Sequence, residues 1–528
     1  MNASREPNAR WWAFAVLGLP TILISMDQSI LYLALPALSS ELGATSTESL
    51  WIMDMYGFLL AGSLITMGSL GDRVGRRKLL LLGAAVFTVA TVIAAFSPTP
   101  TALIVARAAM GIAGATLLPS TLALISNIFT NPRERGSAIA AWFSCLMVGG
   151  ALGPVIGGAL LSWFWWGSVF LVGVPIMAIL LVLGPRLLPE YRDPNAGRID
   201  LLSVPLSLGA ILPIVYALKE FATGADGSAT WVPLICGALV GVIFLRRQQV
   251  ITDPMVDLRL FRSRQLSASL VILFFGSMTT GGMYLVVSLY LQTVEQHSPF
   301  IAGLWLLPST AAIVIGSMAA PGLLGKVRIN HLVAGGLLVT AAGYLLMTQV
   351  PEQGSMVFLV AAFVLAFLGL GPMGAIGTDL VVSGAPAQRA GSAASLSESS
   401  NHLGIAVGIA AFGSIASAVY RSQMAEVDVP ADSVSVTESV MQAATIVRDL
   451  SQESLRVFVG DMNEAFVSGM HVTAWVGVGL FVALAGIAVV ALRGAQPPQP
   501  STDLPGVEDD DVSDDVSTDK ALSADDER

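Results

Sequence analysis

Charged residues are scarce in this sequence. Only 12% of its 528 residues are Asp, Glu, Lys or Arg, while 54% are apolar, whereas about a quarter of the residues in a soluble domain are charged. The mean hydropathy is +0.73. This composition excludes a water-soluble globular protein and indicates a polytopic protein embedded in a lipid bilayer.

Cysteine is nearly absent. Cys145 and Cys236 both fall in apolar runs, without the spacing of a disulfide framework or a metal site, so we interpret them as packing residues and expect no metal. The phosphate-binding pattern Gly-x4-Gly-Lys-Ser/Thr is missing as well. We therefore expect no ATP-driven mechanism and no cofactor. No catalytic constellation is present, which argues against an enzyme.

Excess charge is confined to the C-terminus. The net charge is −10, and the segment 501–528 holds eleven acids against two bases, which leaves the remaining chain at −1. This segment has few apolar residues and follows the proline-rich stretch 496–500. We predict that 493–528 is a disordered cytoplasmic tail, and we expect no nucleic-acid partner.

Apolar runs long enough to cross a bilayer, about 20 residues each, recur along the chain. They predict fourteen spans, beginning near residues 11, 50, 79, 101, 137, 166, 199, 229, 266, 300, 331, 355, 393 and 468. Nineteen Lys and Arg residues fall in the segments on one side, against only Lys219 in the short loops of the other. Because cytoplasmic connections concentrate positive charge, we predict a multi-pass protein of the cell (cytoplasmic) membrane with both termini in the cytoplasm. The first run lacks a signal-peptide cleavage context and stays as a helix.

A short repeat indicates two related halves. Gly68-Ser-Leu-Gly joins the second and third spans, and Gly322-Leu-Leu-Gly joins the tenth and eleventh. Transporters built from repeats place their site between the halves. We predict a six-helix bundle over 1–185, a two-helix insert with linkers over 186–265 and a second six-helix bundle over 266–492. The segment 421–467 would be an extracytoplasmic loop with an amphipathic helix around 436–466.

Ionisable residues inside the spans are the candidate functional groups, because a charge at mid-membrane costs about 2.5–3.5 kcal/mol on insertion scales. Asp27 lies in the first span and Arg107 at a similar depth in the fourth, so we expect them to pair, as a site that exchanges protons or as a static structural ion pair. Asp54 enters the second span only about 6 Å from its outer end. It is either a mouth residue that attracts cations or merely interfacial.

The thirteenth span carries Glu398 and His402. Their i, i+4 spacing puts both on one face of a helix, where histidine can exchange protons near neutral pH. A hydrogen-bonded structural pair is the alternative. Aromatic side chains such as Trp51 and Tyr56 are suited to attract organic cations, although packing or lipid contact is the commoner role of any one such side chain.

Two glycine-rich motifs suggest segments that move relative to neighbouring helices. Small residues at Gly149, Gly153 and Gly157 form a flat helix face for close approach of a neighbour, and Pro154 adds a kink. We interpret this stretch as a pivot or seal, or as an ordinary tight helix crossing.

The second motif is the loop from Gly68 to Lys78. Gly68 and Gly75 permit a tight turn, and Asp72 is placed to accept helix N-terminal amides or to pair with an arginine. The basic residues Arg73, Arg76, Arg77 and Lys78 would anchor the cytoplasmic face. The basic residues here could equally serve only to fix the topology.

These motifs resemble the major facilitator superfamily, and specifically its fourteen-helix drug:H+ antiporter family of quaternary-ammonium and dye exporters. The resemblance covers about residues 11–492. It rests on Met26-Asp-Gln-Ser-Ile with Ala34-Leu-Pro, on Gly68 to Lys78, on Arg107 with Gly111 and Gly114, and on Gly149 to Gly158, the most specific of the four.

The resemblance implies an all-α integral membrane fold of 6+2+6 helices. It also implies that the Gly68–Lys78 loop latches the two halves in one access state. In the family a second carboxylate usually stands where this chain has His402, a departure that puts doubly charged cargo in question.

We therefore predict a proton-coupled multidrug exporter, a monomer in the bilayer, whose partners are protons and small lipophilic, mainly monocationic compounds. Such cargo includes dyes, quaternary ammonium compounds and antibiotics. The alternative is a dedicated exporter of one endogenous metabolite or antibiotic with the same fold.

Overall fold

Long apolar helices make up the computed structural model of the chain, which describes residues 7–129, 131–192, 200, 202–222, 227–251, 254, 256–324, 326–351, 356–384, 390–425 and 452–493. Within these ranges, thirteen helical segments are long and apolar enough to cross a membrane. Within α8, the segment Ser203–Ala217 is a shorter apolar helix. Together they match the fourteen predicted spans. The predicted acidic tail lies outside the described residues.

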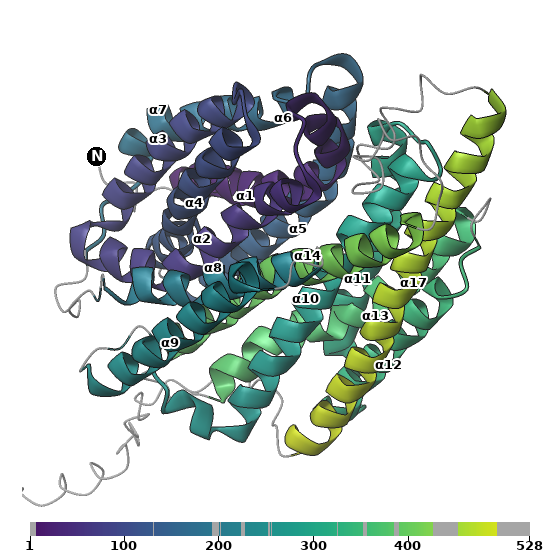
Figure 1. The fold of residues 1–528 in the computed structure, drawn as a ribbon. Helices are drawn as coiled ribbons and strands as arrows, with labels where there is room; N and C mark the ends of the chain where they lie inside the picture. Colours follow the sequence, from purple (N-terminus) through teal and green to yellow (C-terminus); the bar gives the residue numbers. More distant parts are fainter. Residues whose placement is uncertain are drawn as a thin grey trace, which may run out of the picture.

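The first helices pack with one another into what we call the N-terminal bundle (Figure 1). In chain order these are α1 (Pro7–Leu42), α2 (Ser46–Val74), α3 (Arg76–Ala95), α4 (Pro100–Ile128), α5 (Pro132–Trp163), α6 (Ser168–Leu171) and α7 (Gly173–Leu187). α1 packs mainly on α5, and α2 on α4. Threonine caps begin α2 and α4, because the side chains of Thr45 and Thr99 accept backbone N–H groups of the first turn.

The last helices form what we call the C-terminal bundle. They are α10 (Arg264–Thr293), α11 (Pro299–Leu323), α12 (Ile329–Met347), α13 (Met356–Ser383), α14 (Ala390–Met424) and α17 (Gln452–Ala491). Both α14 and α17 extend into the predicted loop 421–467. No proline interrupts α17, so the apolar span continues a helix that begins sixteen residues before the predicted start near residue 468. Residues 426–451 of that loop lie outside the described residues.

Between the bundles run α8 (Ser203–Ala222) and α9 (Ser228–Val250), followed by the short 3-10 helix η1 (Leu260–Arg262). α8 packs on α9, and it also contacts α2 and α14. The start of α8 is fixed by Asp200, which accepts hydrogen bonds from Ser203 and Arg247. Although burial opposes the charge, these hydrogen bonds and the positive charge of Arg247 hold the pKa of Asp200 below its ordinary value.

The two bundles meet along α2 and α14, along α5 and α11, and between α1 and α10. We call the end where α1 begins and α2 turns into α3 the near end, and the opposite end the far end. Contacts between the bundles run from the middle of the helices to the far end: Gly57 meets Ala406, Leu50 meets Gly413, and Gly303 meets Pro154. The structure is therefore closed at the far end.

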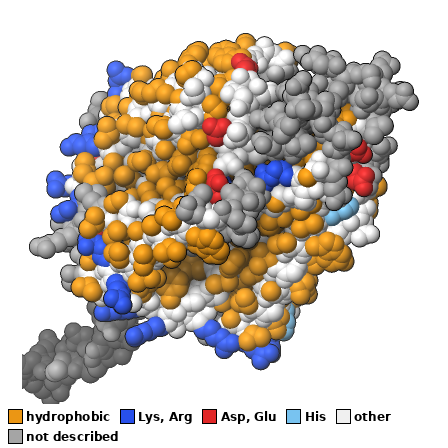
Figure 2. Space-filling view, viewed as in Figure 1, with side chains coloured by type: hydrophobic (Ala, Val, Ile, Leu, Met, Phe, Trp, Pro, Cys, Tyr) orange, Lys and Arg blue, Asp and Glu red, His pale blue; other side chains and the backbone are white. Residues whose placement is uncertain are grey.

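The surface agrees with a membrane setting. Figure 2 shows hydrophobic side chains over most of the visible face, with Lys and Arg gathered along its left and lower edges, toward the near end. α9 is apolar and mostly exposed, with Trp231, Leu239 and Ile243 each more than half exposed. Lipid contact accounts for such a helix.

Close packing of α1 on α5 explains the glycine face at 149, 153 and 157. A Cβ added at Gly149 would collide with the carbonyl oxygen of Ile22, and one at Gly153 would collide with Ser29 Oγ and Met26 O. On its other side α5 meets α11, because a Cβ at Gly158 would lie 2.5 Å from Phe300 Cα. The motif is thus a tight crossing on both faces, and it holds the segment of α1 that carries Asp27.

This packing makes a stability prediction. Gly149→Ala should lower the apparent melting temperature in detergent, because a methyl group forced against helix backbone costs about 1–3 kcal/mol. Gly486→Ala is the matched control, because a Cβ there meets nothing within 4 Å and alanine favours a helix by about 1 kcal/mol over glycine. Equal melting temperatures for the two variants would contradict the packing argument.

Candidate functional site

Asp27 of α1 and Arg107 of α4 form a buried ion pair. Arg107 Nη1 donates to Asp27 Oδ2 at 2.6 Å, and the two side chains are 1% (Arg107) and 8% (Asp27) exposed. The predicted pairing is therefore present. Its short, charge-assisted geometry repays part of the large cost of removing both charges from water.

α2 completes the surroundings of the arginine. The Arg107 guanidinium lies over the Tyr56 ring, 4.5 Å from its centroid, and its Nε donates to the carbonyl oxygen of Ile52 at 3.4 Å. α4 comes this close to α2 because Gly111 and Gly114 have no side chains: a Cβ at Gly111 would lie 2.5 Å from Tyr56 O. The two glycines of the Arg107 motif thus place the arginine against Tyr56.

A cavity of about 20 Å³ adjoins this pair between the bundles. A volume of roughly 10–15 Å³ is needed for a single water molecule, so the cavity is too small for an organic molecule. Arg107 lines it, but Asp27 does not. In this state the arginine therefore stands between the carboxylate and the cavity. The other polar, aromatic and thioether side chains that line it are Gln28, Tyr32, Met53, Tyr56 and His402.

His402 reaches this cavity from the C-terminal bundle. Its Nδ1 lies 3.3 Å from Gln28 Nε2 of α1, where the Gln28 amide donates to Nδ1 in the histidine tautomer that leaves this nitrogen unprotonated. Among the contacts of the described residues, none joins His402 to Glu398. Glu398 lies one turn nearer the near end and is half-buried. The shared face is present, while the hydrogen-bonded Glu398–His402 pair is not.

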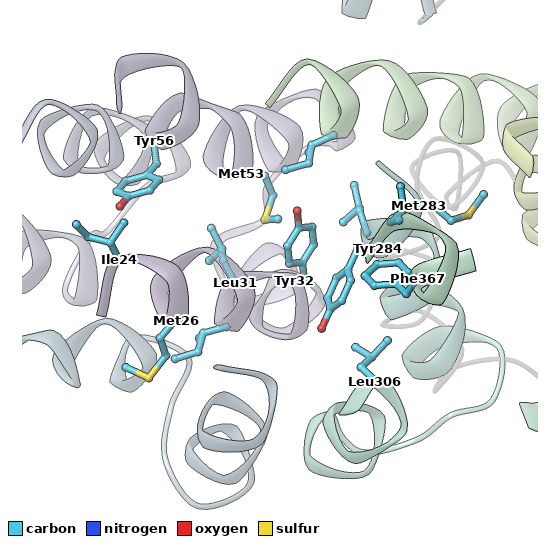
Figure 3. Packing of buried hydrophobic residues seen from close by; sticks show 14 of the residues in the cluster. Ile24, Met26, Leu31, Tyr32, Met53, Tyr56, Met283, Tyr284, Leu306 and Phe367 are labelled. Carbon is cyan, nitrogen blue, oxygen red and sulfur yellow. The ribbon is translucent and has the colours of Figure 1, made fainter. Parts of the chain in front are cut away.

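Aromatic side chains continue the cavity toward the far end. Figure 3 shows Tyr32 of α1 between Met53 of α2 and Tyr284 of α10, with Phe367 beyond. The ring centroids of Tyr32 and Tyr284 are 4.8 Å apart, and those of Tyr284 and Phe367 are 6.2 Å apart. Ser288 donates a hydrogen bond of 3.0 Å to the backbone carbonyl of Tyr32. These contacts close the far side of the cavity.

Asp54 is more enclosed than the sequence predicts. Its side chain is fully buried rather than open at a mouth, and it forms an ion pair of 2.7 Å with Lys219 of α8, which is 1% exposed. Lys219 also lies 3.9 Å from the Trp51 ring centroid. The predicted loop position of Lys219 is wrong as well, because α8 continues to Ala222. The depth estimate treated α2 alone and left out α8, which covers it.

The Gly68–Lys78 loop is helical except at Gly75, which joins α2 to α3, and it contacts α4 and the segment after α7. Asp72 pairs with Arg76 at 2.6 Å, so of the two roles expected for Asp72 the pairing with an arginine is present. Gly75 adopts φ 118°, which favours glycine, and a Cβ there would lie 2.6 Å from Glu190 Oε1. The same glutamate accepts the backbone N–H of Arg77 at 3.1 Å. Arg73 is exposed, and Gly68 faces Pro119 of α4.

Sequence reasoning missed Gln28, Tyr32 and Lys219. A signal existed for the first two, because they stand one and five residues after Asp27 in a span with little polarity. For Lys219 the signal was weaker, because its position at the end of an apolar run suggests a loop. Among the described residues, no group of three His, Cys, Asp or Glu side chains is placed to hold a metal ion.

Comparison with known proteins gives one family. The family model described as Major Facilitator Superfamily matches residues 17–409. The chain is 40% identical to the "Multidrug efflux pump LfrA" of Mycolicibacterium smegmatis, over 93% of this chain and 98% of that protein. It is 35% identical to the "Methyl viologen resistance protein SmvA" of Salmonella typhimurium, over 80% of this chain and 85% of that protein.

A solved structure shows the same fold. The inward-facing, unoccupied structure of a bacterial homolog of the human lysosomal transporter Spinster aligns with a TM-score of 0.65, at 16% identity, over 92% of this chain and 98% of that one. At this identity the likeness concerns the fold alone.

The central pair makes a testable prediction. Asp27→Asn and Arg107→Met should each destabilise the protein in detergent by about 3–5 kcal/mol, because each leaves one buried charge without its partner. The double variant should lose clearly less than the sum of the two. A double-mutant cycle on thermal unfolding measures the difference, and strictly additive losses would show that the pair carries no coupling energy.

Proposed function

Because the chain belongs to the Major Facilitator Superfamily, we propose that it is a multidrug efflux transporter that exchanges protons for lipophilic cations across the cytoplasmic membrane. The relative at 40% identity is named a multidrug efflux pump, and a further relative at 28% is named a multidrug resistance protein. These names favour a broad exporter over a carrier dedicated to one metabolite. The single structural observation that carries the proposal is the Asp27–Arg107 pair beside the cavity.

Competition for one carboxylate is the proposed coupling step. Arg107 now neutralises Asp27 and stands between it and the cavity. A proton on Asp27 removes the charge that holds the arginine, and a cationic cargo near Asp27 offers the carboxylate another partner. Proton and cargo thus exclude each other at one acid. Two occupants that favour different access states and exclude each other suffice to couple their movements.

Aromatic rings in the site suit this exchange. Tyr56 holds the Arg107 guanidinium by a cation–π contact, so a flat organic cation that displaces the arginine finds a ring already placed for positive charge. Tyr32 and Tyr284 add further faces at the far side of the cavity. The cavity must widen to admit such cargo, because its present volume is about 20 Å³.

The access state follows from where the bundles touch. The contacts between them lie from mid-helix to the far end. With both termini in the cytoplasm, as the distribution of Lys and Arg supports, the far end faces outward and the structure is inward-facing. In this state the Gly68–Lys78 loop is held by Glu190, which follows α7, and we propose that the loop latches to the C-terminal bundle when the near end closes.

The remaining roles complete the proposal. The chain acts as a monomer with one site between the bundles 1–185 and 266–492, while the insert 186–265 lies against both. Glu398 and His402 act as a second proton-exchanging position on the cytoplasmic side of the cavity, where half-buried Glu398 is reachable from the near end. The Gly149–Gly158 stretch is the pivot on which α11 moves against α5.

Removal of the central acid tests the function. Asp27→Asn should abolish ethidium uptake into inverted vesicles driven by an imposed pH gradient, because the variant cannot exchange a proton, while the protein still inserts. Glu134→Gln is the matched control, because it removes an acid of an exposed ion pair with Arg10 that contributes little. Undiminished gradient-driven transport by Asp27→Asn would contradict the proposal. Wild-type transport that continues unchanged after the pH gradient is collapsed would contradict it as well.

Cargo charge gives a second test. One relative is named for resistance to methyl viologen, which carries two positive charges, whereas ethidium carries one. His402 stands beside Gln28 at the cavity, so His402→Glu should raise methyl viologen transport relative to ethidium, about tenfold if the added attraction is near 1.4 kcal/mol. His402→Gln keeps a polar group without the charge. An equal transport ratio in both variants would contradict a role for charge at this position.

A further inference from the structure

The second buried ion pair joins the insert to the N-terminal bundle. Asp54 of α2 and Lys219 of α8 are 0% and 1% exposed, and their charged groups are 2.7 Å apart. No hydrogen bond from another described residue reaches either group. Each charge therefore depends on the other for compensation, and separating them inside the bilayer would leave two isolated charges.

Aromatic side chains also hold the C-terminal end of α8. Lys219 Nζ lies 3.9 Å from the Trp51 ring centroid, and Trp51 stacks on Tyr216 with centroids 6.5 Å apart. Lys219 is thus enclosed by one turn of α2 on which Trp51 and Asp54 stand three residues apart. Trp51 and Asp54 thus form a specific binding site for the Lys219 ammonium group.

A second contact aligns α8 along α2. A Cβ at Gly62 would lie 2.7 Å from Leu208 Cδ2, so the two helices also approach closely about two turns of α2 and about three turns of α8 from the ion pair. The attachment of α8 to α2 therefore has two points, one electrostatic and one steric. Two separated points fix the direction of a helix as well as its position.

The buried surface of α8 that faces the C-terminal bundle is apolar rather than charged. Val215 packs in one apolar cluster with Ala406 and Ala410 of α14 and with Phe58 of α2. Small apolar side chains offer little resistance to sliding, since apolar contact is not directional. α14 and α2 belong to different bundles, so an alternating-access cycle moves them past each other.

We propose that Lys219 is a positioning residue of the transport cycle: through Asp54 it fixes the insert to the N-terminal bundle, so that α8 travels with α2 and slides over α14. This inference rests on the proposed function for the motion itself. The ion pair would then keep the α2–α14 seam covered by protein while the two bundles change their relative angle.

Distances between spin labels in proteoliposomes test the tether. Labels at exposed Leu202 of the insert, Asn127 of α4 and Arg328 of the C-terminal bundle report three distances. On adding ethidium, the Leu202–Asn127 distance should stay constant while Leu202–Arg328 and Asn127–Arg328 both change. A change in Leu202–Asn127 as large as that in Leu202–Arg328 would overturn the proposal.

Variants separate positioning from simple stability. Lys219→Met should broaden the narrow Leu202–Asn127 distribution even without cargo and reduce efflux, and the exchanged pair Asp54→Lys with Lys219→Asp should restore both. Glu134→Gln, which removes the exposed pair with Arg10, should leave the distribution unchanged. A narrow distribution in Lys219→Met would overturn the tether whatever its efflux.

The Asn127–Arg328 distance in the same samples tests the proposed function separately. If the Asn127–Arg328 distance never changes, the alternating-access cycle fails, while the cargo-free comparison of Lys219→Met with the parent still decides whether Lys219 holds the insert. The two failures are therefore distinguishable in one set of samples.

Discussion

A carboxylate inside a bilayer is stable only with a partner, and in this chain the partner of Asp27 is Arg107 at 2.6 Å. Low dielectric makes the pair strong and makes either charge alone expensive. The site therefore has few stable states, each defined by what neutralises Asp27. In the proposed cycle, that restriction is what lets a single acid link the movements of two cations without covalent chemistry.

Helix packing sets the geometry of this pair. Gly149 and Gly153 bring α5 against the segment of α1 on either side of Asp27, and Gly111 brings α4 against Tyr56 of α2. Small residues are the usual means of close approach in membranes, where helices gain little from excluding water. The glycines that the sequence presents as separate motifs, one on α5 and one on α4, thus act on one centre.

The sequence was sufficient for the fold class, for the helices and for the pairing of Asp27 with Arg107, because span length, basic loops and equal depth are local quantities. It was insufficient for Asp54, whose partner Lys219 lies 165 residues away on a helix of the insert. Lateral packing of helices is not encoded in depth, so an acid near a helix end could not be recognised as buried. The Gln28–His402 contact was missed for the same reason, because it joins the two bundles.

The cation–π contact of Arg107 with Tyr56 has a consequence for ions that are not cargo. An inorganic cation such as sodium keeps its water shell and gains little from an aromatic face, whereas the guanidinium is weakly hydrated and already seated there. The internal arginine is then a better occupant than any abundant metal ion. In the proposed transport cycle, we expect such a pathway to admit broad, lipophilic cations without dissipating the sodium and potassium gradients of the cell.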